Sequence, residues 1–236
     1  TILVKQKTGE RAVFFERATA TEPEFLEAHK QLIESAYILH INGRHRKLMR
    51  SAMAVAKEVG TIISLDGGAQ RYDEDMKPIT EASHIVIVAR DYAEKYTGTT
   101  NLEDACRIIH ERGAFIAGVT DGANGSYFVW PDGTSYRCEP FSQATVVDTT
   151  GAGDSFHGAF LYMLTKTLCK IADGTNTSTM NETSQSLNAI DLLHSCAHED
   201  LEKAATFASA VAALNTQGIG GRSPLPSLED IKALIG

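Results

Sequence analysis

The sequence predicts an α/β protein with a mostly parallel central sheet that helices cover on both faces. Short apolar runs, separated by segments with the period of amphipathic helices, indicate buried parallel strands. These runs are YILHI (37–41), TIISL (61–65), HIVIV (84–88) and AFIAGV (114–119). Strands that alternate with helices in this way form crossover units, and ligands then bind at the carboxyl ends of the strands. A chain of 236 residues with 43% hydrophobic residues can bury the core of one such domain.

Two hairpins are expected outside the crossover units. In residues 1–15, the runs ILVKQ and RAVFF flank a turn-like segment, which indicates a hairpin. A second hairpin joins SYFVW (126–130) to TSYRC (134–138) through Pro131-Asp132-Gly133, because proline and glycine supply the backbone angles of a tight turn.

Three later helices are expected near residues 154–168, 198–215 and 227–234. Between the first two, the polar stretch GTNTSTMNETSQS (174–186) predicts an exposed, mobile insertion within residues 170–195.

Composition argues against several classes of function. The net charge of −8 does not favour a basic face for nucleic acid or an anionic membrane. No CxxC pair occurs among the four cysteines, so a zinc site and a dense disulfide framework are not expected. Without a membrane-length apolar run or a signal-peptide pattern, the chain is expected to be cytoplasmic, with reduced thiols.

The stretch VVDTTGAGDSFHGAFLYML carries the clearest chemical signal. A strand is expected to end at Val147 and a helix to begin near Asp154. Between them, Gly151, Ala152 and Gly153 have little or no side chain, so their backbone N–H groups can approach an oxyanion at the positive end of the helix. A carboxylate at Asp154 can accept a hydroxyl proton as a general base. From these residues alone, a tight turn with Asp154 as a helix cap stays equally open.

The segment DTTGAGDSFHGAFL resembles, position by position, the C-terminal signature of the PfkB (ribokinase-like) carbohydrate kinases. The resemblance implies a ribokinase-like three-layer sandwich. It also implies that Asp154 is the catalytic base at the acceptor hydroxyl, and that Gly151, Ala152 and Gly153 form the anion hole for the phosphoryl group in flight. Catalysis would then rest mainly on positioning and charge stabilisation.

The same resemblance assigns roles to three neighbouring residues. Asp148 and Thr150 are similar to family positions that help to bind a monovalent cation. His157 is interpreted as a packing or hydrogen-bonding residue rather than a catalyst.

Two further segments resemble nucleotide-binding elements of the family. In VTDGANGSYFV, the residues Thr120, Gly122 and Gly125 would face the phosphates and ribose of ATP, although a plain hairpin turn is the alternative. In FASAVAALNTQGIGGRSPLPSLEDI, the resemblance implies adenine-pocket positions and a nearby loop, although simple core packing of this Ala-rich helix is also open. The residues concerned are Ala208, Ser209, Asn215 and Gly218 to Gly221.

The match weakens at two places. Many members have an Asn-x-x-Glu element linked to magnesium and phosphate where this chain has Ala89-Arg90-Asp91-Tyr92, which is nearer the ketohexokinase-like branch. HINGR (40–44) resembles the same branch, and its Arg44 is a candidate for contacts with phosphates or substrate, or else a surface arginine.

The family's N-terminal section, which grips the substrate hydroxyls, has no counterpart before Thr1. Residues 1–236 are therefore expected to form one kinase domain that is incomplete at its N-terminus and derives from a longer parent. Residues 1–20 are expected to be the remnant of a small β lid or edge hairpin.

The resemblance implies an ATP-dependent kinase that phosphorylates a hydroxyl of a sugar, with a ketose as the first choice, using Mg²⁺ and a monovalent cation such as K⁺. A nucleoside kinase of the same superfamily is the nearest alternative, and a non-catalytic nucleotide-binding relative is another. The partners expected are the sugar and ATP, with no nucleic acid and no membrane; a homodimer is expected only by analogy. Neither a dinucleotide-binding GxGxxG unit nor a GxxxxGK[ST] loop occurs in the sequence.

Overall fold

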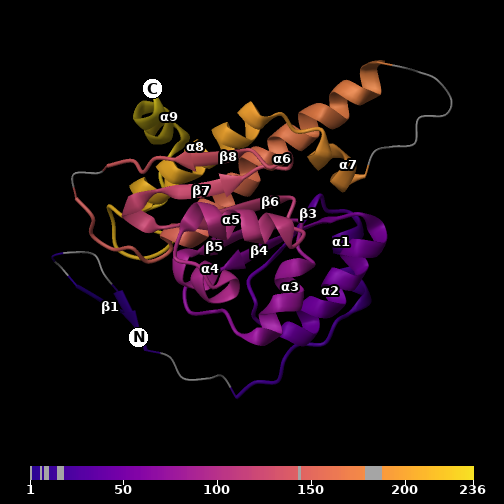
Figure 1. Ribbon diagram of the computed structural model, residues 1–236, viewed down its shortest axis with the longest axis horizontal. Coiled ribbons are helices and arrows are strands. Elements are labelled where there is room, and N and C mark those ends of the chain that lie inside the picture. Colours follow the sequence, from indigo (N-terminus) through magenta and orange to yellow (C-terminus); the bar gives the residue numbers. More distant parts are fainter. Residues whose placement is uncertain (1, 6, 8–10, 15–18, 143–144, 179–187) are drawn as a thin grey trace.

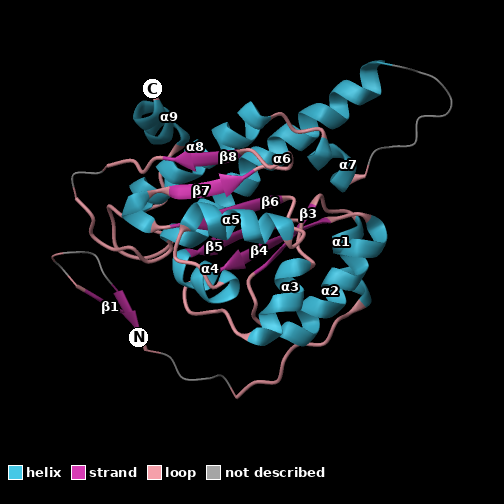
Figure 2. Cartoon of the chain, viewed as in Figure 1, coloured by secondary structure: helices cyan, strands magenta, loops and turns pink. Residues whose placement is uncertain are grey.

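The computed structural model describes residues 2–5, 7, 11–14, 19–142, 145–178 and 188–236. Its centre is a six-stranded sheet with the order β3-β4-β5-β6-β7-β8 (Figures 1 and 2). The first four strands pair in parallel, and the last two pair antiparallel. They are β3 (Ile38–Ile41), β4 (Ile62–Gly67), β5 (Ile85–Ala89), β6 (Ile116–Thr120), β7 (Ser126–Val129) and β8 (Ser135–Cys138). The expected mostly parallel sheet and its terminal hairpin are confirmed.

Helices cover both faces of this sheet and complete three layers (Figure 2). One layer holds α1 (Glu27–Glu34), α2 (Arg46–Val59), α3 (Lys77–Glu81), α4 (Arg90–Thr97) and α5 (Leu102–Glu111). The other holds α6 (Ala152–Ser178), α7 (Ala189–His194), α8 (His198–Asn215) and α9 (Leu228–Ile235). Short 3₁₀ turns are η1 (Glu74–Met76) and η2 (Gly122–Asn124).

Side chains alternate across the sheet and supply a separate hydrophobic cluster to each face. In β4, Ile63 and Leu65 pack toward α1–α5, whereas Ile62 packs toward α6–α9. Ser64 and Asp66 share the face of Ile62 by this alternation, so β4 places polar side chains beneath the α6 layer toward its carboxyl end.

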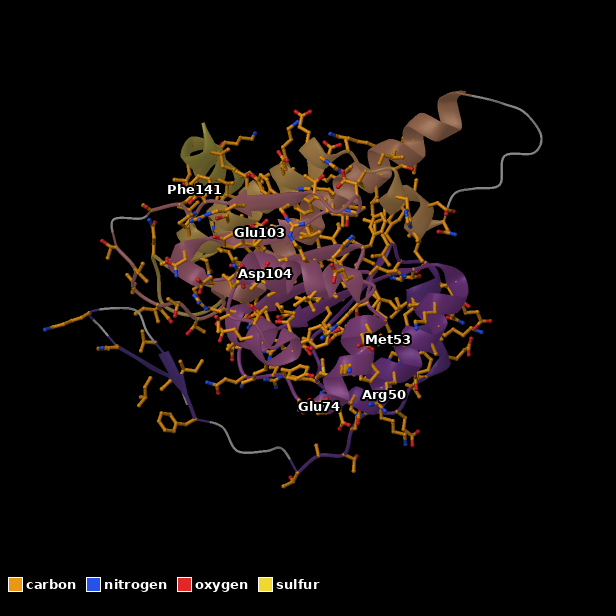
Figure 3. The ribbon with its side chains drawn as sticks, viewed as in Figure 1. Arg50, Met53, Glu74, Glu103, Asp104 and Phe141 are labelled. Carbon is orange, nitrogen blue, oxygen red and sulfur yellow. The ribbon has the colours of Figure 1, made fainter. Side chains whose placement is uncertain are left out.

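The helices follow the same rule. On α2, Met53 is buried toward the sheet and Arg50 is exposed (Figure 3). At the start of α5, Asn101 Oδ1 accepts hydrogen bonds from the N–H groups of Glu103 and Asp104, which stabilises the helix end.

The N-terminal hairpin is present in the described residues. Strand β1 (Ile2–Val4) pairs antiparallel with β2 (Arg11–Val13), with Ile2 opposite Val13. The turn residues 8–10 lie outside the described part of the chain. In Figure 1 the hairpin lies apart from the three layers. Its role as a lid stays a prediction.

Two local predictions are wrong. Residues 145–149 form no strand, because the N–H groups of Val147 and Asp148 donate instead to the carbonyl oxygen of Thr216 (2.8 and 3.1 Å). The exposed segment expected over 170–195 is also shorter than predicted, since α6 continues to Ser178 and α7 buries Leu192 and Leu193. Residues 179–187, at the centre of that prediction, lie outside the described residues.

The four cysteines form no disulfide in the described part of the chain, and Cys106 and Cys138 are buried. Among the helices that the structure describes, none is both long and apolar enough to cross a membrane.

Candidate active site at the start of helix α6

The first turn of α6 presents an exposed carboxylate beside backbone donors. Asp154 is exposed, and the neighbouring Ser155 and Phe156 are buried, which fixes the turn on the protein. Ala152 N–H donates to Thr149 O, but within the described residues the N–H groups of Gly153 and Asp154 donate to no other residue. Unpaired N–H groups at a helix N-terminus favour an anion. Of the donors that the sequence predicts, the N–H of Gly153 is therefore open among the described residues and that of Ala152 is engaged, and the role of this segment as an anion hole stays a prediction.

A second loop, residues 216–221, holds this segment in place. Asp148 Oδ1 accepts the N–H of Thr150 at 2.8 Å, and Asp148 Oδ2 accepts the N–H of Gly220 at 2.9 Å. Asn215 Nδ2 donates to Thr150 O at 3.3 Å. Asp148 is therefore a buried cross-link between two loops that are far apart in the sequence.

Gly151 allows the two loops to touch. Its φ of 79° lies in the left-handed region, and a Cβ atom there would lie 2.5 Å from the Cα atom of Gly221. Any side chain at this position would separate the loops or strain the backbone.

The same junction contains buried oxygen atoms that suit a cation. Within the described part of the chain, Thr150 Oγ1 and Asn215 Oδ1 have no hydrogen-bond partner. Hard cations prefer carboxylate, carbonyl and hydroxyl oxygens, and Asp148 adds negative charge nearby. The residues present thus fit a monovalent cation. No group of three or more His, Cys, Asp or Glu side chains among the described residues is arranged to hold a metal ion.

The predicted nucleotide loop lies at the carboxyl end of β6. Thr120 ends the strand and is partly buried, and η2 follows immediately. Gly122 and Gly125 have positive φ angles of 53° and 86°, and a Cβ atom on Gly125 would lie 2.4 Å from Cys138 O. The loop is therefore a compact turn packed on the end of β8, and its contact with nucleotide stays a prediction.

An ion pair that sequence reasoning did not anticipate joins this loop to the end of β5. Arg90 donates to Asp121 at 2.7 Å and to Glu94 at 2.9 Å. The stretch that departs from Asn-x-x-Glu thus supplies a cation beside the loop. Asp91 instead accepts the N–H of Gln70, which has a positive φ of 62°.

Helix α8 contributes mainly buried side chains. Ala208 is fully buried in the cluster beneath α6, and Ser209 donates to Glu139 O at 3.4 Å. Phe141, which lies beyond β8 (Figure 3), packs on the same cluster. The fold is therefore compatible with both predicted roles of this helix, core packing and contact with adenine. Gly218 is partly buried, and a Cβ atom there would lie 2.6 Å from Pro224.

Arg44 lies in the loop after β3 with an exposed side chain, and its backbone N–H donates to Asn42 Oδ1. The structure gives it no contact with Asp154, so a role in substrate binding stays a prediction.

Sequence reasoning missed a polar cluster beneath the start of α6. His157 Nε2 lies 3.3 Å from Asp66 Oδ1, and Arg71 donates to Asp66 Oδ2 at 3.5 Å. The ring centroids of His40 and His157 lie 5.5 Å apart. His40 Nδ1 lies 3.2 Å from Ser64 Oγ, within hydrogen-bond distance. We call Asp66, Arg71, His157 and His40 the Asp66 cluster. The available signal was that Ser64 and Asp66 fall on a face of β4 where apolar residues are expected.

Electrostatics links this cluster to Asp154. Burial alone would raise the pKa of Asp66, but the hydrogen bond from His157 and the charges of His157, Arg71 and His40 outweigh it and lower the pKa. His40 lies on the edge strand β3 and is partly exposed. Its pKa is nevertheless lowered, first by desolvation and then by the charge of His157, whereas the charges of Asp66 and Asp154 act in the opposite direction.

A mostly apolar groove of about 390 Å³ is lined by Asp154 and by residues of α6, α8 and the segment that follows α8. Its walls also include Tyr162, Phe207, Val211, Leu228 and Arg222.

Comparison with known proteins places this chain in a family. The model of the pfkB family of carbohydrate kinases matches residues 1–228. The 5-dehydro-2-deoxygluconokinase of Shouchella clausii (strain KSM-K16) is 23% identical over 86% of this chain and 57% of its own length. Probable fructokinase-5 of Arabidopsis thaliana is 28% identical over 98% of this chain and 68% of its own length. The chain thus spans between 57% and 68% of the length of these two relatives.

A solved structure supports the fold independently. A fructokinase double mutant from Vibrio cholerae O395, in its fructose-, ADP- and potassium-bound form, aligns with 100% of this chain and 72% of its own at a TM-score of 0.70 and 20% identity. The expected ribokinase-like α/β architecture is confirmed.

Proposed function

Because the chain belongs to the pfkB family of carbohydrate kinases, we propose that it carries the catalytic and ATP-binding part of a kinase that phosphorylates a sugar hydroxyl. A ketose is the first candidate acceptor, supported by the fructokinases among its relatives. The observation that carries the proposal is the exposed Asp154 beside the N–H groups of Gly153 and Asp154 itself, at the N-terminus of α6.

In this proposal Asp154 accepts the proton of the acceptor hydroxyl, and the N–H groups stabilise negative charge on the phosphoryl group. ATP supplies the phosphoryl group, and its phosphates hold Mg²⁺ and bring it to the site. The loop from Thr120 to Gly125 would receive the nucleotide, with Ala208 and Ser209 on the adenine side. Asp148, Thr150 and Asn215 would hold K⁺, which would brace the junction of the two loops.

The proposal extends to the setting of the enzyme. The family and the free thiols favour the cytoplasm, where ATP and sugars are available. Homodimerisation is proposed only by analogy with relatives that dimerise through a β lid.

The test is an ADP-release assay on this protein, with ketoses, aldoses and nucleosides as acceptors in Mg²⁺ and K⁺. Turnover on a ketose is expected, and turnover only on nucleosides would reassign the acceptor.

Asp154→Asn should reduce kcat by about 10²-fold or more, because the amide cannot act as a general base. Its ADP affinity, measured by calorimetry, should stay within about threefold, since the N–H groups remain. An Asp154→Asn enzyme with unchanged kcat would remove Asp154 from the base role.

A further inference from the structure

The first turn of α6 is attached to the sheet at two points of different character. Phe156 packs near Phe128 of β7, with ring centroids 6.4 Å apart. His157, the next residue, reaches the other way, to Asp66 at the end of β4. In the sheet, β5 and β6 lie between these two strands. The turn that carries Asp154 therefore spans the middle of the sheet.

The two attachments constrain the turn differently. Apolar packing is non-directional, so the Phe156 contact permits some rotation of the helix about its axis. The His157 to Asp66 contact joins two polar atoms, Nε2 and Oδ1, at 3.3 Å, and the strength of such a contact depends on its direction. It can therefore fix the rotation that Phe156 leaves open.

This pair is poorly explained as a device for stability. The side chains of His157 and Asp66 are only 6% and 10% exposed. Burying a charged or polar pair costs desolvation that its mutual attraction often fails to exceed. A buried pair beside a functional site is better explained by the orientation that it imposes.

The hydrogen-bond pattern also orients the imidazole ring. His157 Nδ1 is buried and has no partner among the described residues. A buried N–H without an acceptor is costly, so when the ring is neutral its proton belongs on Nε2, where Asp66 accepts it. With Nε2–H fixed on Asp66, the ring and the backbone that bears it have one preferred orientation.

Asp154 lies one helical turn before His157, so a rotation of that turn moves its carboxylate directly. We propose that His157, oriented by Asp66, is a positioning residue that sets the direction of Asp154 and of the N–H groups at the start of α6. This inference rests on the proposed kinase function. Misplacing reacting groups by about 1 Å can cost about 10²-fold in rate, so an effect on kcat is expected without direct contact with substrate.

The test compares two replacements of His157 in this protein. His157→Leu removes the contact with Asp66 and fills the space with an apolar side chain. It should lower kcat about tenfold or more and leave the KM for ATP within about twofold of the wild-type value. His157→Gln can still donate from its amide to Asp66 and should keep kcat within about threefold of wild type.

A second His–Asp pair provides the matched control. His198 Nε2 also lies 3.3 Å from an aspartate oxygen, that of Asp132, but these side chains are 41% and 52% exposed. His198→Leu should leave kcat unchanged. Equal losses in His157→Leu and His198→Leu, or a loss of less than about twofold in His157→Leu, would overturn the proposal.

A double-mutant cycle tests whether Asp66 acts through His157. Asp66→Asn should also lower kcat, and adding it to His157→Leu should cause little further loss, because the two residues act as one unit. Fully multiplied losses would contradict the proposed coupling.

A readout without turnover separates this inference from the kinase proposal. The amide NMR signals of Gly153 and Asp154, and their shifts on adding ADP, report the orientation of the first turn directly. If wild type shows no turnover on any acceptor, the proposed function fails. Altered signals in His157→Leu but not in His157→Gln would still support positioning, and identical signals in all three proteins would refute it.

Discussion

Gly151 links backbone geometry to chemistry at the scale of one residue. Gly151→Ala would place a methyl group 2.5 Å from Gly221 Cα at a φ of 79°. We expect a loss of about 1–3 kcal/mol in the free energy of unfolding, because the strain cannot relax without parting the loops. ADP release should fall by about 10²-fold as the anion-binding donors move.

Urea denaturation and the ADP assay measure these two effects. Gly158→Ala in the same helix is the control, since a Cβ atom there meets nothing within 4 Å. It should stabilise the protein by about 0.5–1 kcal/mol. Matching stabilities of the two variants would show that Gly151 is not constrained as described.

Sequence reasoning proposed the residues of the candidate site that form one continuous stretch. Asp154 and Gly151 could be predicted because a turn of small residues before a helix has local physical requirements. The pairing of Asp66 with His157 could not, because it depends on how α6 lies over β4. The ion pair of Arg90 with Asp121 was missed for the same reason, since it joins the ends of two strands.

At the scale of elements, His84 connects β5 to its neighbours and makes stability depend on pH. Its Nδ1 accepts the N–H of Ile63 at 2.9 Å, which requires that nitrogen to be unprotonated. Burial, followed by the charges of Lys57 and His194, lowers the pKa of His84 below its ordinary 6.5. The unfolded chain therefore binds this proton more readily than the folded protein, and stability is lost as the pH falls through 6.5 toward the folded pKa.

His84→Asn should reduce this loss, because an amide oxygen can accept the same hydrogen bond without titrating. The measurement is the free energy of unfolding between about pH 5 and pH 8, where histidines titrate. His40, whose pKa is also lowered, should leave a residual slope of the same sign. Equal slopes for wild type and His84→Asn would exclude His84 as a contributor.

The elements themselves could largely be predicted because their signals are local. Helix α8 has the predicted bounds, and the apolar runs form strands whose ends lie within two residues of those predicted. The failures lie where tertiary contacts decide. The backbone before Gly151 bonds to Thr216 rather than to a sheet, and α7 is short but buries Leu192 and Leu193.

On the scale of the whole molecule, the alternation of strands and helices was sufficient to predict the layers, and it places the candidate site at the carboxyl edge of the parallel strands. It could not predict that the segments before α6 and after α8 meet beside that edge. Asp148 joins them through Thr150 and Gly220, so the site depends on parts of the chain that helices α6 to α8 separate.

This dependence predicts that nucleotide, cation and global stability are coupled. A ligand that binds only the folded protein stabilises it by about 2.7 kcal/mol at a hundred times its Kd. If K⁺ binds to the oxygens of Thr150 and Asn215, the rise in Tm on adding ADP should be larger in KCl than in NaCl at equal ionic strength.

The variant Asp148→Asn tests this assignment. It removes the negative charge and turns an amide N–H toward a backbone donor, so it should shrink the rise in Tm and abolish the difference between the salts. Asp132→Asn is the control, because Asp132 also accepts a backbone N–H, from Thr134 at 2.9 Å, but in the turn between β7 and β8. Scanning calorimetry of wild type and the two variants measures the rise in Tm in each salt. If Asp148→Asn keeps the full difference in Tm rise between KCl and NaCl, the cation acts elsewhere. If only Asp148→Asn loses that difference, the cation binds at the junction of the two loops.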